Sequence, residues 1–309
     1  MNDRALFLAG ATATGKSEVA LRLAERFGGE IISVDSMQVY RGLDIGTAKP
    51  DAAARRRGPH HLIDVAELDE PFDAARFVRL ASAAAAEIRA RNRLPVFCGG
   101  TGLYFKAFLE GLGEAPASDA VLRAELSATP LPVLLEELER RDAATFAAID
   151  RQNPRRVIRA LEVIRLTGKP FSAQRAAWSA SSSVHDPQAP ILWCLTRETV
   201  DLHQRIQVRV ETMFARGLGA EVEGLLARGL AKNQTAMQAI GYRQVVEHLR
   251  GEQALAETIE LVKIRTRQFA KRQMTWFRRQ PQMRRVECGP TEKAEQVAER
   301  IAEMASLNH

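Results

Sequence analysis

The chain has 309 residues, of which 46% are hydrophobic and 27% are charged, a composition that is typical of soluble globular proteins and excludes a disordered or fibrous one. The formal net charge of +6 suits a polyanionic partner without identifying it. The three cysteines are far apart, no stretch has the form of a secretion signal, and no window reaches eighteen apolar residues, so we expect a cytoplasmic protein without disulfides, metal knuckles or membrane contact.

Short apolar strands alternate with helices in the amino-terminal third, which predicts an α/β fold with a parallel sheet flanked by helices. The expected elements are a strand at 5–9, a helix at 16–27, a strand at 30–34, a helix at 73–91 and a strand at 95–98. Further along, the expected elements are a strand at 191–195, a helix at 197–216, a shorter pair ending near 250, and a long helix at 252–279.

Two stretches rich in Gly, Pro, Ser and Ala, at 111–119 and 179–190, bracket a mostly helical segment. We interpret residues 114–190 as a helical insertion domain. Residues 1–113 and 191–309 then form the core domain, which ends in basic helices.

A G-x-x-x-x-G-K-[ST] motif directly follows the first predicted strand and opens into the first helix. In such a loop, backbone N–H groups surround phosphate oxygens, the lysine supplies a cation, and the last hydroxyl can bind Mg²⁺. The motif consists of Gly10, Ala11, Thr12, Ala13, Thr14, Gly15, Lys16 and Ser17. We therefore predict a P-loop NTPase-like core that binds a diphosphate or triphosphate, with Mg²⁺ as cofactor and Ser17 as its ligand. A glycine turn that binds no phosphate is the alternative.

Five further blocks resemble, in the same order along the chain, the signature of the tRNA dimethylallyltransferase family, also called isopentenyl-diphosphate:tRNA transferases. The blocks are Ser33 to Pro50, His60 to Asp64, Gly99 to Tyr104, Gly241 to Arg243, and Lys271 to Arg278. Within the phosphate loop the chain departs from the family at Ala11, where most members carry Pro, and at Thr14, where many carry Ser. Neither change removes a phosphate donor.

The resemblance implies transfer of a dimethylallyl group from dimethylallyl diphosphate to the N6 amine of the adenine 3′ to the anticodon, with release of diphosphate. It implies tRNAs that read codons beginning with U, and a phosphate loop that binds a prenyl diphosphate where related folds bind ATP. The partners expected from it are the anticodon stem-loop of tRNA and dimethylallyl diphosphate, bound by a monomer.

An aromatic amine is a weak nucleophile, so its attack on an allylic carbon needs a carboxylate to take the proton and positive charge on the departing diphosphate. Asp35 ends the second predicted strand, at the edge where open α/β sheets bind ligands, and is the expected base. Its alternative roles are a helix cap or an outer magnesium group. Lys16 is expected on the diphosphate, and Thr101 can donate to the bridging oxygen, although a structural turn threonine is equally compatible with the sequence.

The resemblance also assigns Arg209 to the diphosphate, whereas its spacing from Arg205 alone indicates an ordinary solvated helix face. Val39 and Tyr40 are considered as borders of the prenyl tail, with a core or rim position as the alternative. The pair His60–His61 lacks Cys or acidic partners in register, so buried or capping histidines are favoured over metal ligands. Asp64 is left without a role.

Residues 263–285 contain nine Lys or Arg and no Asp or Glu. Four of these basic residues, Lys263, Arg267, Lys271 and Arg278, step together with Met274 along one helix face. Such a basic stripe predicts contact with a phosphate backbone, and a merely solvated face is the alternative. A second basic cluster lies in the insertion at 151–165, where Glu162 is the one acidic residue. Tyr242 and Arg243 are expected to contact unstacked bases.

The residues expected to contact tRNA combine these patterns with the resemblance. They are Asp35, Ser36, Met37, Gln38, Thr101, Arg123, Arg155, Arg156, Val157, Ile158, Arg159, Ala239, Ile240, Gly241, Tyr242, Arg243, Lys271 and Arg278. Two rival functions remain open. A small-molecule kinase would use the phosphate loop and Asp35 but not the basic helix, and a noncatalytic RNA-binding protein would have no use for the phosphate loop.

Overall fold

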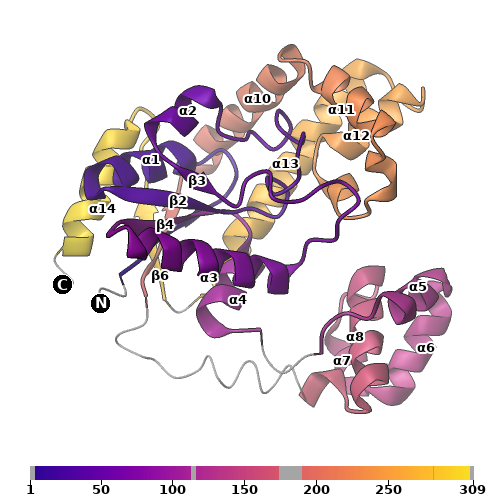
Figure 1. Ribbon diagram of the computed structural model, residues 1–309. Coiled ribbons are helices and arrows are strands. Elements are labelled where there is room, and N and C mark those ends of the chain that lie inside the picture. Colours follow the sequence, from indigo (N-terminus) through magenta and orange to yellow (C-terminus); the bar gives the residue numbers. More distant parts are fainter. Residues whose placement is uncertain (1–3, 113–115, 174–189, 281, 307–309) are drawn as a thin grey trace. The chain divides into compact units, whose positions relative to one another are not determined.

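The computed structural model describes residues 4–112, 116–173, 190–280 and 282–306 (Figure 1). The chain divides into two compact units, one formed by Met1–Leu109 with Gln188–His309 and the other by Glu110–Pro187. We call them the core unit and the inserted unit. The boundaries expected from the sequence differ from these by a few residues, and most of the polar stretch at 179–190 lies outside the described residues.

The core unit is built on one parallel sheet. Within the described ranges the sheet has six strands in the order β3-β2-β4-β1-β5-β6. The strands are β1 (Leu6–Gly10), β2 (Gly29–Val34), β3 (His60–His61), β4 (Leu94–Gly99), β5 (Leu192–Thr196) and β6 (Met283–Glu287). The predicted α/β class is therefore confirmed, and β1, β2, β4 and β5 lie where the sequence placed strands.

Strands β3 and β6 were not predicted, for two different reasons. β3 has only two residues, too few to give a pattern. In β6 only Val286 is buried, and the exposed Arg284 and Arg285 interrupt the apolar alternation that identifies a strand. Both lie at the edges of the sheet, where one side needs no partner strand.

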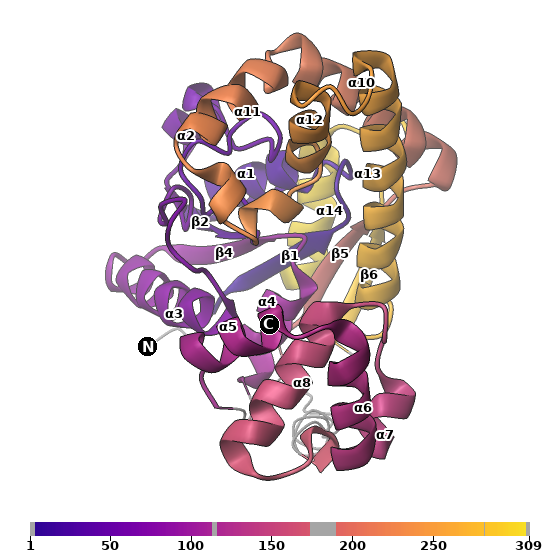
Figure 2. The same cartoon turned by 90° about the vertical axis from the view of Figure 1, so that its right-hand side faces the viewer.

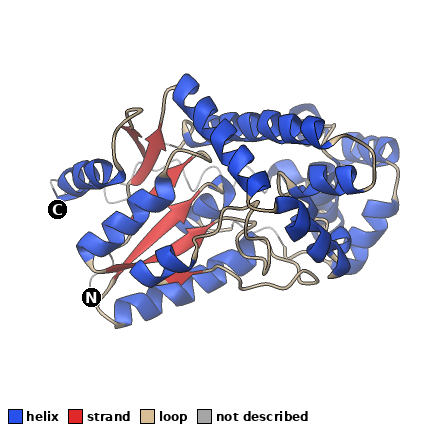
Figure 3. Ribbon diagram, turned by 90° about the horizontal axis from the view of Figure 1, so that it is seen from above, coloured by secondary structure: helices blue, strands red, loops and turns tan. Residues whose placement is uncertain are grey.

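Helices cover both faces of this sheet (Figure 3). The core unit contains α1 (Lys16–Phe27), α2 (Ala52–Arg57), α3 (Ala74–Ala90), α4 (Gly102–Glu110), α10 (Thr199–Ala215), α11 (Leu218–Ala227), α12 (Tyr242–Leu249), α13 (Leu255–Phe277) and α14 (Ala294–Ser306). The expected helices at 16–27, 73–91, 197–216 and 252–279 are confirmed as α1, α3, α10 and α13, with ends shifted by at most a few residues. In the described part of the chain, none of the helices has the length and apolar character needed to cross a bilayer.

Side chains of β1, β2, β4 and β5 alternate between two hydrophobic cores. In β1, Leu6 and Leu8 pack with α1 and α14, whereas Phe7 and Ala9 belong to the core formed with α3, α4, α11 and α12. Burial of each large side chain contributes about 1.5–3 kcal/mol, so the two cores fix the sheet firmly between its helices. Helices α10 to α13 pack side by side, as Figure 2 also shows.

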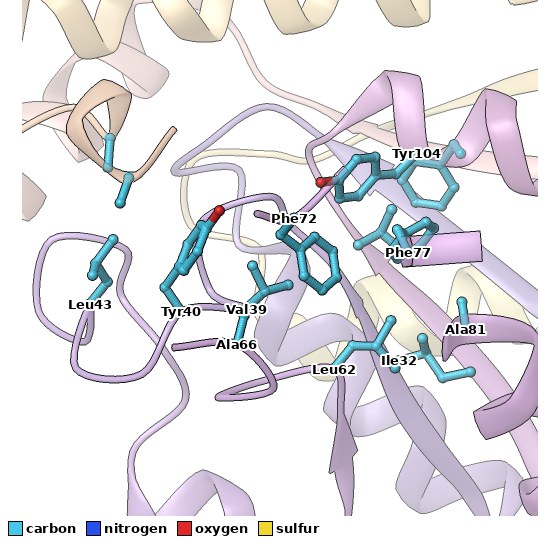
Figure 4. Packing of buried hydrophobic residues seen from close by; sticks show 14 of the residues in the cluster. Ile32, Val39, Tyr40, Leu43, Leu62, Ala66, Phe72, Phe77, Ala81 and Tyr104 are labelled. Atoms are coloured by element: carbon cyan, nitrogen blue, oxygen red, sulfur yellow. The ribbon is translucent and has the colours of Figure 1, made fainter. Parts of the chain in front are cut away.

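The segment after β2 is anchored in the second of these cores (Figure 4). Val39 and Tyr40 are fully buried there, close to Phe72 and to the stacked pair Phe77 and Tyr104, whose ring centroids are 4.4 Å apart. Of the two roles considered for Val39 and Tyr40, the core position is therefore correct. Neither side chain is therefore available to line a ligand site.

The inserted unit is a small helical domain with its own core. Its helices are α5 (Ala120–Ala128), α6 (Leu131–Arg141), α7 (Ala143–Ala148) and α8 (Pro154–Thr167). Leu126, Leu134, Leu138 and Leu161 meet at its centre, fully or almost fully buried. Asp119 and Asp142 cap α5 and α7, each accepting a backbone N–H of the first turn, which explains where these helices begin.

Candidate active site

The phosphate loop (residues 10–17) begins at the carboxyl end of β1. Strand β1 is an inner strand of the sheet and lies between β4 and β5. Since all strands are parallel, the carboxyl ends of β2 and β4 lie at the same edge. A cavity of about 350 Å³, a size typical of small-molecule sites, opens there. Its polar lining includes Thr12, Lys16, Ser17, Asp35, Ser36, Gln38, Thr101, Arg209, Arg272 and Gln273.

The loop conformation depends on its own hydrogen bonds and on residues in the left-handed region. Ala13 and Gly15 have φ angles of 65° and 92°. The Thr14 hydroxyl donates to the Ala11 carbonyl at 2.8 Å, and Lys16 Nζ donates to the same oxygen at 3.2 Å. Ala11 is fully buried in a cluster that also contains Val210 and Val262, so packing holds this part of the loop in place.

Two side chains that the sequence analysis missed support the loop from other elements. Gln273, in α13, accepts the Thr12 N–H and donates to the Gly100 carbonyl, both at 2.9 Å. Arg197, just after β5, donates to the Thr14 carbonyl at 2.9 Å. Gln273 lies inside the block Lys271 to Arg278 that carried the family resemblance, which was the available signal. For Arg197 the sequence offered none.

Asp35 and Thr101 lie beside the loop with part of their hydrogen-bonding capacity unused. Oδ1 of Asp35 accepts the N–H groups of Met37 and Gln38 at 2.8 and 3.2 Å, whereas no donor among the described residues binds Oδ2. The Thr101 oxygen accepts the Ser36 N–H at 3.1 Å, which leaves its own proton available for a ligand. Asp35 therefore caps a turn with one oxygen and presents the other to the cavity.

Arg209 belongs to the cavity, so the solvated-face interpretation is wrong. One turn earlier, Arg205 turns away to pair with Asp201 at 3.0 Å. Burial lowers the pKa of the Arg209 guanidinium, and the charge of Asp35 opposes this shift. Burial likewise lowers the pKa of the Lys16 ammonium. Two half-buried cations and one carboxylate leave an excess of positive charge, which favours binding of an anion.

Cys98 forms part of the cavity wall beneath Lys16. Its thiol donates to the Lys16 carbonyl at a sulfur–oxygen distance of 3.6 Å. Burial raises the pKa of Cys98 to about 12, so this sulfur is a neutral thiol at physiological pH.

We expect proton uptake when a diphosphate binds. A phosphate anion stabilises charged Lys16, so binding should raise the pKa that burial has lowered. Below the lowered pKa Lys16 is charged with or without ligand, and affinity is highest. As the pH rises through that pKa, binding must take up a proton and affinity falls. Calorimetry with inorganic diphosphate in buffers of different ionisation enthalpy measures the uptake. The same uptake in Lys16→Met would contradict this assignment.

Several residues expected to contact tRNA also line the cavity, namely Ser36, Met37, Gln38, Ala239 and Ile240. Tyr242 does not. Its ring is fully buried and its hydroxyl donates to Glu221 at 2.6 Å, so the expectation of base contact through this ring is wrong. Burial and the Glu221 carboxylate raise the pKa of Tyr242, which keeps the phenol a donor. Arg243 is exposed and pairs with Glu247. Gly241 directly precedes α12 as its N-cap, with a φ of 99°.

The basic stripe on α13 is shorter than expected. Lys263 is buried and pairs with Glu211 and Glu260, both at 2.8 Å, so it is unsuited to bind phosphate. Lys271 and Arg278 are exposed, as predicted. Phe269 and Arg272, which the sequence analysis did not single out, line the cavity, with the guanidinium carbon 5.8 Å from the ring centroid. The helix thus extends the site from the phosphate loop to solvent.

The arginines of the inserted unit are partly neutralised by Glu162, whose side chain is fully buried. Glu162 pairs with Arg123 at 2.9 Å and with Arg159 at 2.6 Å. Arg155 and Arg156 are exposed, Ile158 is half-buried, and Val157 is fully buried in the unit's core. The expectation that the Val157 side chain contacts tRNA is therefore wrong, because a core position cannot meet a ligand.

The histidine pair is structural, as the sequence analysis favoured. His60 Nδ1 lies 2.8 Å from the Gly58 carbonyl, and His61 Nε2 lies 2.7 Å from a carboxylate oxygen of Glu30. Asp64, which had no predicted role, pairs with Lys49 and Arg55. Across the residues that the structure describes, no cluster of His, Cys, Asp or Glu is arranged to hold a metal by itself.

The fold and the site define a P-loop-like protein whose polar cavity opens at the carboxyl edge of a parallel sheet. A family model described as IPP transferase matches residues 38–280, and one described as isopentenyl transferase matches residues 4–64. The chain is 47% identical to tRNA dimethylallyltransferase 1 of Trichlorobacter lovleyi, over 92% of this chain and 93% of that one. It therefore belongs to the tRNA dimethylallyltransferase family, which confirms the resemblance of the sequence blocks.

Solved structures support the same assignment. The tRNA isopentenylpyrophosphate transferase of Bacillus halodurans aligns with a TM-score of 0.72 at 37% identity, covering 99% of this chain and 97% of that one. A eukaryotic dimethylallyltransferase, described as acting on tRNA, aligns with a TM-score of 0.78 at 25% identity, covering 99% and 79%. The P-loop-like fold is thus shared with both.

Proposed function

We propose that this member of the family is a prenyltransferase that moves a dimethylallyl group from dimethylallyl diphosphate to the N6 amine of the adenine 3′ to the anticodon. The tRNAs concerned would read codons beginning with U. The observation that carries the proposal is the cavity in which the cations Lys16 and Arg209 lie with the carboxylate Asp35. The two cations suit stabilisation of the departing diphosphate, and the carboxylate suits removal of the proton from the adenine amine.

In the proposed reaction the adenine nitrogen attacks the allylic carbon, and the carbon–oxygen bond breaks with its electron pair leaving on the diphosphate. The proton of the amine passes to Oδ2 of Asp35. Lys16 and Arg209 neutralise the charge that grows on the leaving group, so their contacts strengthen in the transition state. Thr101 donates its hydroxyl proton to the same group, while its oxygen accepts the Ser36 N–H.

Mg²⁺ fits the proposed site as a shared cation. It commonly binds through few protein ligands together with substrate phosphates, and the Ser17 hydroxyl at the cavity supplies one such ligand. The ion would add positive charge to the leaving diphosphate. The absence of a preformed acidic cluster in the described residues is compatible with a metal that arrives with the diphosphate.

The apolar part of the cavity suits a short prenyl tail. Met37, Val210, Met213, Ile240 and Val262 line it, and they come from the segment after β2, from α10, from the turn before α12 and from α13. The dimethylallyl group has only five carbons, so it can be held between these side chains. These residues replace Val39 and Tyr40 as the proposed neighbours of the tail.

For tRNA we propose contact along α13 and through the exposed arginines of the inserted unit. Phe269 offers an aromatic face and Arg272 a cation at the mouth of the cavity, which suits a base that has left its stack. Lys271 and Arg278 would bind backbone phosphates. Unstacking costs a few kcal/mol, which such backbone contacts offset.

Replacing Lys271 and Arg278 together by Gln should weaken tRNA binding and lower the slope of log K against log salt by about two counterions. Binding of the stem-loop measured at several salt concentrations gives that slope. Arg4 and Arg26, both exposed and located at the opposite edge of the sheet, are the matched control pair. An unchanged slope in the Lys271/Arg278 variant would remove α13 from the proposed RNA surface.

Mass analysis of adenosine tests the proposed function directly. The full chain is incubated with Mg²⁺, dimethylallyl diphosphate and a tRNA anticodon stem-loop, and the adenosine is expected to gain one dimethylallyl group. Labelled ATP in place of dimethylallyl diphosphate tests the rival kinase function. Transfer of phosphate from ATP to a small alcohol without prenylation would overturn the proposal, and retention of the stem-loop without any transfer would favour a binding protein.

A further inference from the structure

Two backbone segments of the cavity wall come from distant parts of the sequence. One is formed by residues 46–48, in the loop after β2, and the other by residues 238–240, in the turn before α12. Neither segment belongs to the phosphate loop. Both segments line the cavity, so whatever fixes them relative to each other also shapes the site.

Glu221, in α11, joins these two segments. Its Oε2 accepts the Ile45 N–H at 2.8 Å, and its Oε1 accepts the Gly46 N–H at 3.4 Å. The same Oε1 accepts the Tyr242 hydroxyl at 2.6 Å, two residues after the second wall segment. A carboxylate that receives three donors in a partly buried place is held in one orientation, because such charge-assisted bonds are stronger than neutral ones.

Packing strengthens the same link. The fully buried Tyr242 ring lies directly against Gly46, where a Cβ atom would overlap the ring. A residue with a side chain at position 46 would push the loop away from α12, so glycine is required there for steric reasons. Its φ angle is not in the left-handed region, so backbone conformation does not require glycine.

On its other side the loop is tied to the segment that carries Asp35. Nε2 of Gln38 donates to the carbonyls of Thr47 and Ala48 at 3.2 and 3.4 Å, while the Gln38 N–H donates to Asp35 Oδ1. A continuous chain of hydrogen bonds thus runs from Tyr242 through Glu221 and the loop to Asp35. If the loop moves, Gln38 and then the Asp35 carboxylate lose their support.

We propose that Glu221 is a positioning residue, which holds residues 45–48 against α12 so that Asp35 and the cavity wall stay aligned for the acceptor nitrogen. The proposal rests on the prenyl transfer proposed above and adds a residue to it. Glu221 lies outside the phosphate loop, so its role concerns the acceptor side of the site. Binding of the diphosphate should not depend on it.

Glu221→Gln tests this inference, because the amide puts N–H groups where the carboxylate receives donors. We expect kcat for prenyl transfer to fall about ten- to hundredfold, as is common when a reacting group is displaced by about 1 Å. The Kd for inorganic diphosphate should stay within about twofold. Tyr242→Phe keeps the ring against Gly46 and removes one donor, so a smaller fall in kcat is expected. Glu223→Gln, exposed on the same helix, is the matched control and should behave as the unaltered protein.

The outcomes separate the inference from the proposed function. Absence of prenyl transfer in the unaltered chain would overturn the function itself. With an active unaltered chain, an unchanged kcat in Glu221→Gln would overturn the positioning role, as would a loss of diphosphate affinity in parallel with kcat. If Glu221→Gln does not fold, Tyr242→Phe decides, and an unchanged kcat there overturns the inference.

Discussion

Asp35→Asn should lower the rate of prenyl transfer by about 10²- to 10⁴-fold, the usual contribution of a general base. The amide keeps an oxygen that can accept the N–H groups of Met37 and Gln38, so the local turn should survive. What is lost is the basic Oδ2, which the cavity leaves without a donor among the described residues. Single-turnover transfer to the stem-loop measures the chemical step apart from product release.

The control for Asp35 is Asp69→Asn, an exposed carboxylate outside the cavity. It should leave transfer unchanged. Binding of tRNA and of inorganic diphosphate should be similar in both variants, since neither ligand is expected to depend on proton removal. Normal turnover by Asp35→Asn with normal tRNA affinity would exclude Asp35 as the base and leave only its capping role.

Arg209→Gln should lower kcat/KM for dimethylallyl diphosphate by about 10²- to 10³-fold. This is the usual effect of removing one preorganised donor from a charge that develops in the transition state. Arg209 is half-buried and lines the cavity together with Asp35, so its charge is close to where the leaving group is proposed to lie. Arg209→Lys should not restore full activity, because an ammonium cannot reproduce the two-pronged contact of a guanidinium with phosphate oxygens.

Arg205→Gln is the matched control, since it removes the same charge one turn earlier on the same helix. Arg205 pairs with Asp201 and faces away from the cavity, so its loss should change kcat/KM little. A similar fall in both variants would show that the effect is a general one of charge or of helix stability. Initial rates measured over a range of dimethylallyl diphosphate concentrations separate effects on KM from effects on kcat.

The sequence predicted the catalytic edge of the fold well because short-range signals define it. The motif from Gly10 to Ser17 joins a strand to a helix, and Asp35 follows a second strand, so parallel topology alone brings them to one edge. The helix beginning at Lys16 was placed correctly for the same reason. No tertiary contact had to be known for these predictions.

Residues that depend on tertiary contacts could not be found in this way. Gln273 reaches Thr12 across 261 positions of the sequence, and Glu221 reaches Ile45 across 176. Helical periodicity identifies a polar face but does not show whether that face borders a cavity or bulk solvent. The position of Arg209 in the sequence was therefore also compatible with a solvated surface. Lys263 belonged to a basic run in sequence, yet its neutralising partners Glu211 and Glu260 lie upstream of that run.

The protonated state of Cys98 has a consequence for the lifetime of the enzyme. An allylic diphosphate is an alkylating agent, and a cysteine thiolate is among the strongest nucleophiles in proteins. Cys98 lines the cavity that the reagent is proposed to enter. Because burial raises the pKa of Cys98 to about 12, only a minute fraction of the sulfur is anionic near neutrality. A neutral thiol is a weak nucleophile, so Cys98 would compete poorly with the incoming base for the allylic carbon of the proposed substrate.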